Sequence, residues 1–234
     1  DGSQIVAPVD KEIIGEVRAI ESYADIKTMD EEEAKAQGLF NIVGKEMDDK
    51  YIEVIKKHVL NPEIVREQGK ELKVVYTPLH GSGYRLVPEV LRRIGFKAEN
   101  ILTVPEQMIL DGDFPTVEKP NPEFKSSFNL GLEIAKKENC DLIIGTDPDA
   151  DRFGSAFPDK DGNYVLVTGN QMGALLTDYI LLSKKEFGKL PADGVVIRSI
   201  VTSPFVDKIA EYYGVELQEC LTGFKWIAYL EDQM

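Results

Sequence analysis

Cysteine is scarce in this sequence, and long hydrophobic runs are absent. Cys140 and Cys220 are the only cysteines among 234 residues. Two are too few for a disulfide framework or a zinc site, so a reducing, cytoplasmic location is expected. No apolar stretch approaches the roughly 20 residues that a membrane-spanning helix needs. The N-terminal residues lack the basic and apolar regions of a signal peptide, and the chain begins as if cut from a longer one. No membrane partner is therefore expected.

Positive charge is also in short supply. The chain has 27 Lys and Arg against 41 Asp and Glu, a net charge of −14. Nucleic-acid binding requires Lys and Arg arrayed on one face, so nucleic acid is not an expected partner. A phosphorylated small molecule still fits if its site is locally positive through a cation, Arg, Lys or backbone N–H groups.

What the sequence does contain is the pattern of an α/β protein. Short apolar runs alternate with segments of helical periodicity, which predicts parallel sheets with right-handed crossovers. Strands are expected over 72–77, 101–104, 141–146, 194–200 and 215–220. Helices are expected over 11–23, 48–60, 87–94, 123–138, 172–179 and 204–213, with a further one beginning near 222. A second α/β unit is expected to begin near Gly162.

Three carboxylates alternate directly after the expected strand 141–146. They are Asp147, Asp149 and Asp151 in the segment DPDADR. In a tight loop alternate residues can turn the same way, and three converging anions repel one another unless a cation lies among them. Oxygen-only ligands suit Mg²⁺, Mn²⁺ or Ca²⁺ rather than zinc. Arg152, the next residue, could hold a phosphate oxygen beside the metal.

Other interpretations of this loop fit less well. An EF-hand requires Gly at position six and Glu at position twelve, where this chain has Arg152 and Pro158. A haloacid-dehalogenase-type phosphatase resembles D-x-D-x-[TV], but the fifth position here is Asp151. An acidic surface turn is the remaining alternative.

Three more residues are candidates for binding a phosphate group. His80 lies in a glycine-containing loop before a helix, where backbone N–H groups can face an anion; a hydrogen bond within the loop is the alternative role. Lys225 lies at the expected start of a helix. Arg198 is a charge late in an apolar strand, and the alternative is that this strand end simply reaches solvent.

Four segments in order resemble the α-D-phosphohexomutase family, most closely its phosphoglucomutase branch within the phosphoglucomutase/phosphomannomutase group. They are TPLHGSGY (77–84), DGDFPTVEKPNPE (111–123), GTDPDADRFG (145–154) and TGFKWI (222–227). The metal loop of that family is usually D-G-D-x-D-R. Here Pro148 replaces the glycine, which stiffens the loop and keeps every carboxylate. The likeness spans nearly the whole chain.

The resemblance implies a fold and a set of site residues. It implies two mixed, mostly parallel-sheet α/β domains of a four-domain enzyme, with residues 1–20 from the first domain or a linker, 21–161 as the second and 162–234 as a truncated third. It implies Asp147, Asp149 and Asp151 as Mg²⁺ ligands. It also implies substrate contacts by Arg152, Arg198 and Lys225, and a possible phosphate contact by His80.

The resemblance also implies a reaction. The parent would be an isomerase of carbohydrate metabolism and a phosphoprotein, interconverting glucose 1-phosphate and glucose 6-phosphate through a phosphoserine and glucose 1,6-bisphosphate. Its phosphoserine lies in a T-A-S-H-N-P-like segment of the first domain, but no Ser here is followed by His. The chain alone is therefore expected to be inactive, with the missing domains 1 and 4 as its partners. A mannose or pentose phosphate as substrate, and a non-enzymatic Mg²⁺ or sugar-phosphate binding module, are the alternatives.

Overall fold

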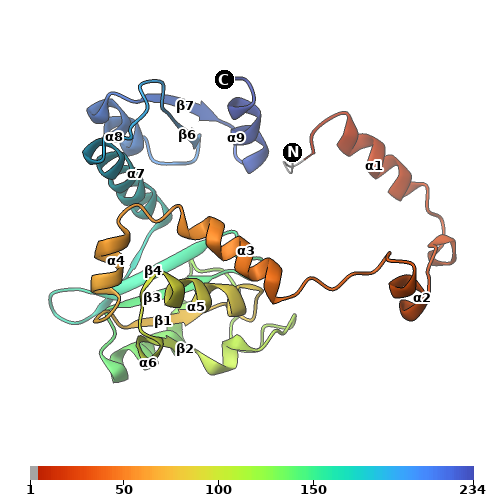
Figure 1. Cartoon of the computed structure of the whole chain (residues 1–234), viewed down its shortest axis with the longest axis horizontal. Helices are drawn as coiled ribbons and strands as arrows, with labels where there is room; N and C mark the ends of the chain where they lie inside the picture. Colours follow the sequence, from red (N-terminus) through yellow and green to blue (C-terminus); the bar gives the residue numbers. More distant parts are fainter. Residues whose placement is uncertain (1–4) are drawn as a thin grey trace. The chain divides into compact units, whose positions relative to one another are not determined.

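The structure, a computed structural model, describes residues 5–234 (Figure 1). The chain divides into two compact units, one over Met47–Leu190 and one formed by residues up to Glu46 together with Pro191–Met234. The α-helices are α1 (Val9–Arg18), α2 (Glu31–Ala36), α3 (Lys45–Lys56), α4 (Pro62–Gln68), α5 (Gly83–Ile94), α6 (Asn129–Glu138), α7 (Gly169–Glu186), α8 (Phe205–Tyr213) and α9 (Phe224–Glu231). The strands are β1 (Val74–Thr77), β2 (Ile101–Thr103), β3 (Leu142–Thr146), β4 (Phe153–Pro158), β5 (Tyr164–Val167), β6 (Val195–Ser199) and β7 (Glu216–Cys220). Short 3₁₀ turns are η1 (Tyr23–Asp25), η2 (Ala98–Asn100), η3 (Pro105–Met108) and η4 (Lys125–Phe128).

The unit over Met47–Leu190 is built on a five-stranded sheet in the order β2-β1-β3-β4-β5. The strand β1 runs parallel to both β2 and β3, which confirms the three parallel strands predicted from the apolar runs. The strands β4 and β5 continue the sheet as an antiparallel hairpin. This hairpin was not predicted, and through it the sheet extends to Val167.

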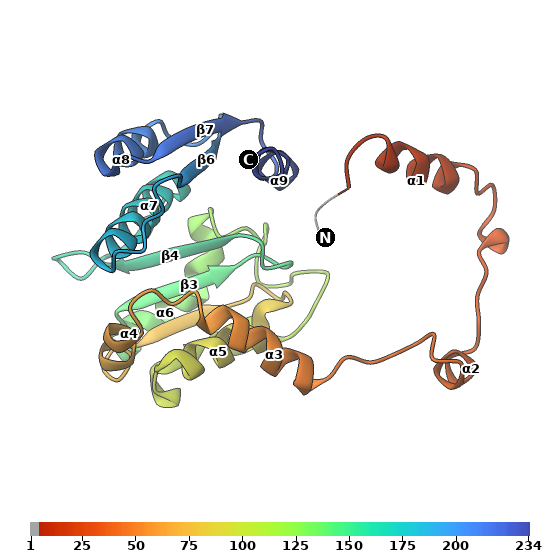
Figure 2. The same cartoon turned by 45° about the horizontal axis from the view of Figure 1, so that its top comes forward.

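The core lies on both faces of this sheet. Figures 1 and 2 show α6 on one face and α3 and α5 on the other. The fully packed cluster on the α6 side contains Val75, Val104, Phe128, Ala135, Cys140, Ile143 and Ala156. Because β1 and β3 are covered on both faces, they carry continuous apolar runs rather than alternating ones.

Two ion pairs join the helices α3 and α5. Arg85 lies 2.9 Å from Asp48, and Arg93 pairs with Asp49 on α3. Of the α3 side chains only Ile52 is fully buried, whereas Tyr51 is 52% exposed.

The helix α7 belongs to the same unit. Asn61, in the link between α3 and α4, donates to the Tyr179 hydroxyl at 2.8 Å and to Ser183 at 3.0 Å. The N-terminus of α7 is capped by Thr168. The Thr168 hydroxyl accepts from the Gln171 backbone N–H, and the Gln171 side chain accepts from the Thr168 backbone N–H.

The segment from Pro191 forms a β–α–β–α arrangement. The strands β6 and β7 pair in parallel, from Val195 opposite Glu216 to Ser199 opposite Cys220, with α8 between them in sequence. Val206, Ile209 and Ala210 form the buried face of α8, as the periodicity predicted. In the N-terminal segment, α1 and α2 have no buried residue.

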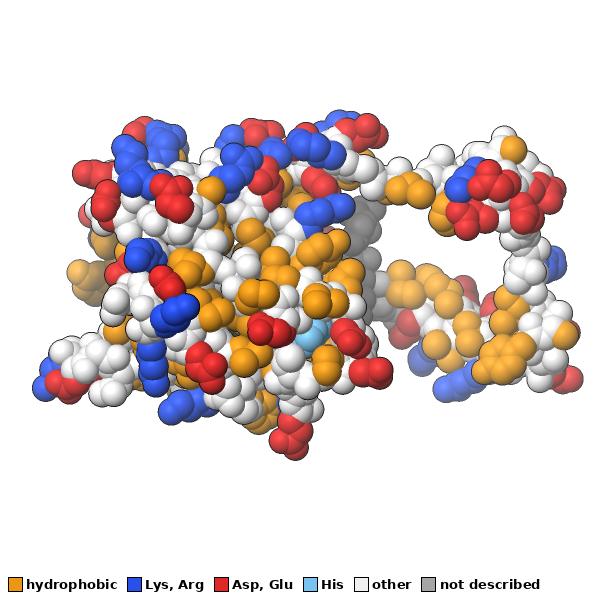
Figure 3. Space-filling model, turned by 90° about the horizontal axis from the view of Figure 1, so that it is seen from below, with side chains coloured by type: hydrophobic (Ala, Val, Ile, Leu, Met, Phe, Trp, Pro, Cys, Tyr) orange, Lys and Arg blue, Asp and Glu red, His pale blue; other side chains and the backbone are white. Residues whose placement is uncertain are grey.

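The surface carries charge of both signs among apolar side chains. Figure 3 shows this mixture on one face of the chain. Several side chains of α7 are part of the exposed apolar surface, among them Leu175 at 57%. None of the helices within residues 5–234 combines the length and the apolarity needed to cross a membrane.

The loops that follow β1 and β3 touch each other through their backbones. Gly81 lies so close to the β3–β4 loop that a Cβ added there would be 2.2 Å from the Pro148 Cα and 2.4 Å from its carbonyl oxygen. Backbone atoms cannot turn away as a flexible side chain could. The contact is therefore possible only with glycine at position 81.

We predict that Gly81→Ala destabilises the fold by about 2 kcal/mol or more, because overpacking against backbone forces the two loops apart. The free energy of unfolding in urea measures this. Gly112→Ala is the matched control, since an added Cβ there meets nothing within 4 Å, and we expect it to change stability by less than about 0.5 kcal/mol. Equal stability of the two variants would contradict the close approach.

Candidate metal centre

The segment 147–152 is the loop of the β3–β4 hairpin. The strands close it at the pair Thr146 and Phe153. Within it the Asp147 N–H donates to the Arg152 carbonyl at 3.3 Å, and the Ala150 N–H donates to the Asp147 carbonyl at 3.0 Å. Ala150 adopts a left-handed conformation with φ of 61°. This tight path turns alternate side chains toward a common side.

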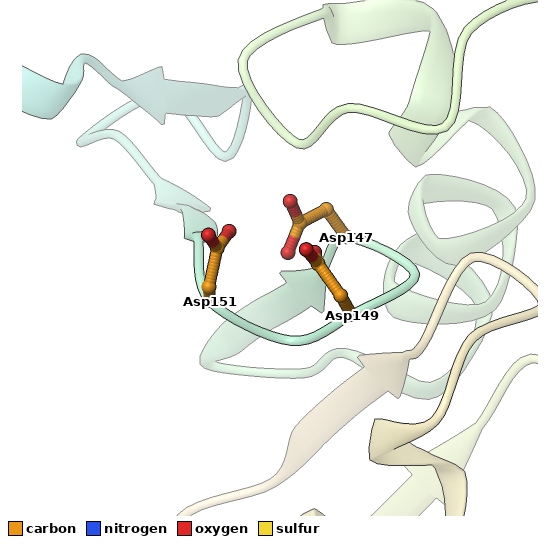
Figure 4. Close-up of side chains that lie close together, drawn as sticks. All are labelled: Asp147, Asp149 and Asp151. Atoms are coloured by element: carbon orange, nitrogen blue, oxygen red, sulfur yellow. The ribbon is translucent and has the colours of Figure 1, made fainter. Parts of the chain in front are cut away.

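The three carboxylates of this loop converge as the sequence predicted. One oxygen each from Asp147, Asp149 and Asp151 lies within 4.8 Å of the others (Figure 4). Within residues 5–234 they form the only such group of potential metal-ligating side chains. Two oxygens on opposite sides of Mg²⁺ would be about 4.2 Å apart, twice the usual Mg–O distance. Adjacent ligands of an octahedral Mg²⁺ lie about 3 Å apart. The donor set therefore fits Mg²⁺, and the exposed Asp149 and Asp151 side chains would move inward to bind it.

Asp147 is the fixed member of the group because it is completely buried. Its carboxylate accepts the Arg152 backbone N–H at 3.0 Å and the Arg152 Nε–H at 2.8 Å. Burial alone would raise the pKa of Asp147, but these hydrogen bonds and the charge of Arg152 outweigh it and hold that pKa below its usual value. Asp147 is thus kept as a carboxylate with no solvent around it.

Asp151 experiences the opposite effect. Partial burial and repulsion by Asp147 and Asp149 raise the pKa of Asp151 above its usual value. The three carboxylates therefore lie closer together than their charges favour, and a cation among them would relieve this repulsion.

The loop after β1 holds the carboxylate loop 147–152 from one side. The Ser82 N–H and the Ser82 hydroxyl both donate to the Pro148 carbonyl, at 2.8 Å and 3.0 Å. Parallel β1 and β3 bring their carboxyl ends to one edge of the sheet, so the two loops meet there. Ser82 lies inside the segment TPLHGSGY noted in the sequence. Its contact with Pro148 could not be predicted, because the two residues are far apart in the sequence.

His80 is buried, and both of its ring nitrogens have partners within the fold. Nδ1 lies 2.9 Å from the Ile109 carbonyl and Nε2 lies 2.8 Å from the Thr116 hydroxyl. This arrangement agrees with the alternative role considered for His80 in the sequence, a residue that forms hydrogen bonds within the loop. The phosphate contact of His80 stays a prediction.

Arg198 and Lys225 belong to the segment that begins at Pro191. The Arg198 side chain is only 9% exposed and pairs with Asp207 at 2.5 Å and Glu219 at 2.6 Å. Lys225 lies over the Trp226 ring, with Nζ 5.5 Å from its centroid. Neither pairing was foreseen, and the substrate contacts of both residues stay predictions.

A groove of about 470 Å³ reaches the metal loop between α3 and α5. Its walls are largely apolar, and Asp149 and Ala150 form one end. The residues from the two helices are Tyr51, Ile55, Gly83, Leu86, Val87, Val90 and Leu91. The sequence did not predict this groove, because it depends on how the two helices cross.

Comparison with known families identifies two matching regions. Residues 49–162 match the family described as phosphoglucomutase/phosphomannomutase, alpha/beta/alpha domain II, and residues 168–233 match alpha/beta/alpha domain III of the same family. The carboxylate loop lies within the first match. Together the two regions cover most of the chain.

Curated relatives carry several mutase names. A probable phosphomannomutase from Haemophilus influenzae is 34% identical over 97% of this chain and 43% of its own length. A phosphoribomutase from Saccharomyces cerevisiae is 35% identical over 97% of this chain and 38% of its own length. A phosphoglucomutase from Staphylococcus aureus is 39% identical over 79% of this chain and 31% of its own length. The chain thus spans less than half of each of these relatives.

A solved structure shares the fold. The putative phosphomannomutase from Thermus thermophilus is 21% identical, covers 80% of this chain and 39% of its own, and superposes with a TM-score of 0.61. The two matched regions and the similarity over nearly the full chain confirm the resemblance seen in the four segments. The chain belongs to the phosphoglucomutase/phosphomannomutase family, of which it carries α/β/α domains II and III.

Proposed function

We propose that this chain forms the metal-binding part of a phosphoglucomutase that interconverts glucose 1-phosphate and glucose 6-phosphate. The convergence of Asp147, Asp149 and Asp151 beside Arg152 carries the proposal. The mutase names of the relatives support it. In the proposed reaction a phosphoserine from elsewhere in the protein donates its phosphoryl group to the sugar, and the resulting glucose 1,6-bisphosphate reorients and returns the other one.

The three aspartates would hold Mg²⁺, with the buried Asp147 as the rigid ligand and the other two closing onto the ion. Bound there, Mg²⁺ supplies positive charge against the oxygens of the transferring phosphoryl group. The Arg152 side chain is 57% exposed while its Nε stays on Asp147. The rest of its guanidinium can therefore donate to a phosphate oxygen beside the metal.

The relatives are named for glucose, mannose and ribose phosphates. Steady-state kinetics of the full-length protein on glucose 1-phosphate, mannose 1-phosphate and ribose 1-phosphate would decide among them. We propose glucose because the four segments most resemble the phosphoglucomutase branch. We also propose that the second domain spans 21–161 and the truncated third 162–234.

We predict that Asp149→Asn lowers the Mg²⁺ affinity of the chain about 10-fold or more, because it removes a ligand charge, and outer-shell changes alone have effects of that size. A Mg²⁺ titration followed by amide NMR measures the dissociation constant. Asp161→Asn is the control, since Asp161 lies in the exposed turn at the opposite end of β4. Equal Mg²⁺ affinity of the wild type and the Asp149→Asn variant would overturn the assignment of this loop as a metal site.

We predict that the purified 234-residue chain has no mutase activity, because it contains no counterpart of the phosphoserine segment. The assay follows conversion of glucose 1-phosphate to glucose 6-phosphate, with an identically purified blank from the expression host as control. Turnover well above that blank would refute the proposal that the phosphoserine comes from outside this chain. If the full-length protein is also inactive on every sugar phosphate tested, the non-enzymatic binding module becomes the better description.

We predict that glucose 1,6-bisphosphate shifts the amide resonances around Lys225, because an exposed phosphate attracts the ammonium group away from the Trp226 ring. Arg198 should respond less, since Asp207 and Glu219 already occupy its guanidinium. Lys225→Gln should abolish the local shifts, whereas Lys189→Gln, at a similarly placed Lys over the Phe187 ring, should leave them unchanged. Shifts that survive in Lys225→Gln would remove this residue from the proposed site.

A further inference from the structure

We infer that a buried chain of hydrogen bonds from Thr77 through Gln107 and Thr116 to His80 positions the metal loop. None of its members is one of the proposed metal ligands, and each acts through its neighbours in the fold, so they are positioning residues. The inference rests on the proposed function of the Asp147–Asp151 loop as a Mg²⁺ site. It gives a role to His80 and to the segment 105–117, which the proposed reaction does not use.

The chain of hydrogen bonds is continuous. The Leu79 N–H donates to the Thr77 hydroxyl at 3.1 Å, and that hydroxyl donates to Gln107 Oε1 at 2.6 Å. The other end of the same amide, Gln107 Nε2, donates to the Thr116 hydroxyl at 3.0 Å. Thr116 in turn lies 2.8 Å from His80 Nε2. Each group therefore serves two neighbours at once.

The direction of the chain follows from its ends. A backbone carbonyl can only accept, so the 2.9 Å contact with the Ile109 carbonyl puts a hydrogen on His80 Nδ1. In that tautomer Nε2 accepts from Thr116, whose oxygen is left to accept from Gln107. Thr77, Gln107 and His80 are 0%, 1% and 4% exposed, whereas Thr116 is partly buried, so water is excluded from the Thr77–Gln107 bond and has restricted access to the two bonds of Thr116. Removing one hydroxyl would leave polar atoms on both sides without a partner.

This chain adds side-chain hydrogen bonds to a strained turn that backbone hydrogen bonds also hold. Leu79 and His80 both have positive φ, 48° and 66°, a conformation that costs energy for residues other than glycine. The segment 105–117 has no regular structure after η3, yet its backbone also binds His80. The His80 N–H donates to the Gln107 carbonyl at 2.9 Å, and the Asp111 N–H donates to the His80 carbonyl at 3.4 Å.

The strained turn leads directly to the metal loop. The Gly81 N–H donates to the Pro78 carbonyl at 2.8 Å, and Ser82 then makes both of its bonds to the Pro148 carbonyl. Pro148 lies between the two ligands Asp147 and Asp149. Displacement of His80 would therefore move Ser82 and the residue that separates two of the three carboxylates.

Thr116→Val in the 234-residue chain tests this inference, because valine keeps the shape of threonine and removes only the hydroxyl. Thr177→Val is the matched control: Thr177 is also partly buried, and its hydroxyl donates to the Gly173 carbonyl at 2.7 Å within α7. Two quantities are measured by NMR, the Mg²⁺ dissociation constant and the hydrogen-exchange rate of the Ser82 amide.

We expect Thr116→Val to weaken Mg²⁺ binding about 10-fold, the lower end for partners outside the ligand shell. We also expect faster exchange of the Ser82 amide, while Thr177→Val changes neither. A folded Thr116→Val chain with both quantities unchanged would overturn the inference and leave the metal site intact. A wild-type chain that binds no Mg²⁺ would overturn the proposed function, and the inference with it.

Ser82→Ala decides the matter if Thr116→Val fails to fold. Ser82 is exposed, so the fold does not depend on its hydroxyl, and the variant removes only the 3.0 Å bond to the Pro148 carbonyl. Weaker Mg²⁺ binding would support the last link between the turn and the metal loop. Unchanged binding would show that the Ser82 hydroxyl does not position the loop and would overturn this link of the inference.

Discussion

The structure around the metal loop depends on one buried carboxylate that remains charged. Asp147 has lost all contact with solvent, and an ionised group in that position must be compensated within the protein. Arg152 provides the compensation with its backbone N–H and its Nε–H, five residues along the same chain. This requirement closes the loop on itself and leaves Asp149 and Asp151 exposed to solvent beside Asp147. The candidate metal site is thus organised around an ion pair formed within the protein itself.

The parts of the fold that could be predicted are those with a strong local pattern. The strands β1 and β3 could be predicted as apolar runs, because both of their faces are covered. The helices α5 and α8 could be predicted from the 3.6-residue period of their apolar side chains. The β4–β5 hairpin carries no comparable pattern. Its first strand has a buried centre of Gly154, Ser155 and Ala156 between exposed ends. That burial comes from pairing with β3 and from contact with Pro122, which the local sequence does not encode.

The site shows the same division between local and distant information. The convergence of the three aspartates could be predicted because they alternate within five residues of one loop. The partners of His80 were not, since they lie 29 and 36 residues further along the chain. Arg198 stands out in the sequence as a charge in an apolar strand. Its carboxylate partners are Asp207 on α8 and Glu219 on β7, which the local sequence does not reveal. The sequence identified single residues in an unusual local setting, but only the folded chain shows their hydrogen-bond and ion-pair partners.

The position of the carboxylates in a hairpin has a consequence for how related chains can differ in length. The pairing of Thr146 with Phe153 leaves room for six residues, and one more or one fewer would shift the register of β4 and turn its buried side chains to the other face. The turn over 159–163, at the far end of the same strand, is exposed throughout and lies next to no such constraint. Insertions and deletions among homologous chains should therefore accumulate at that turn and spare the loop, even where the amino acids between the aspartates vary.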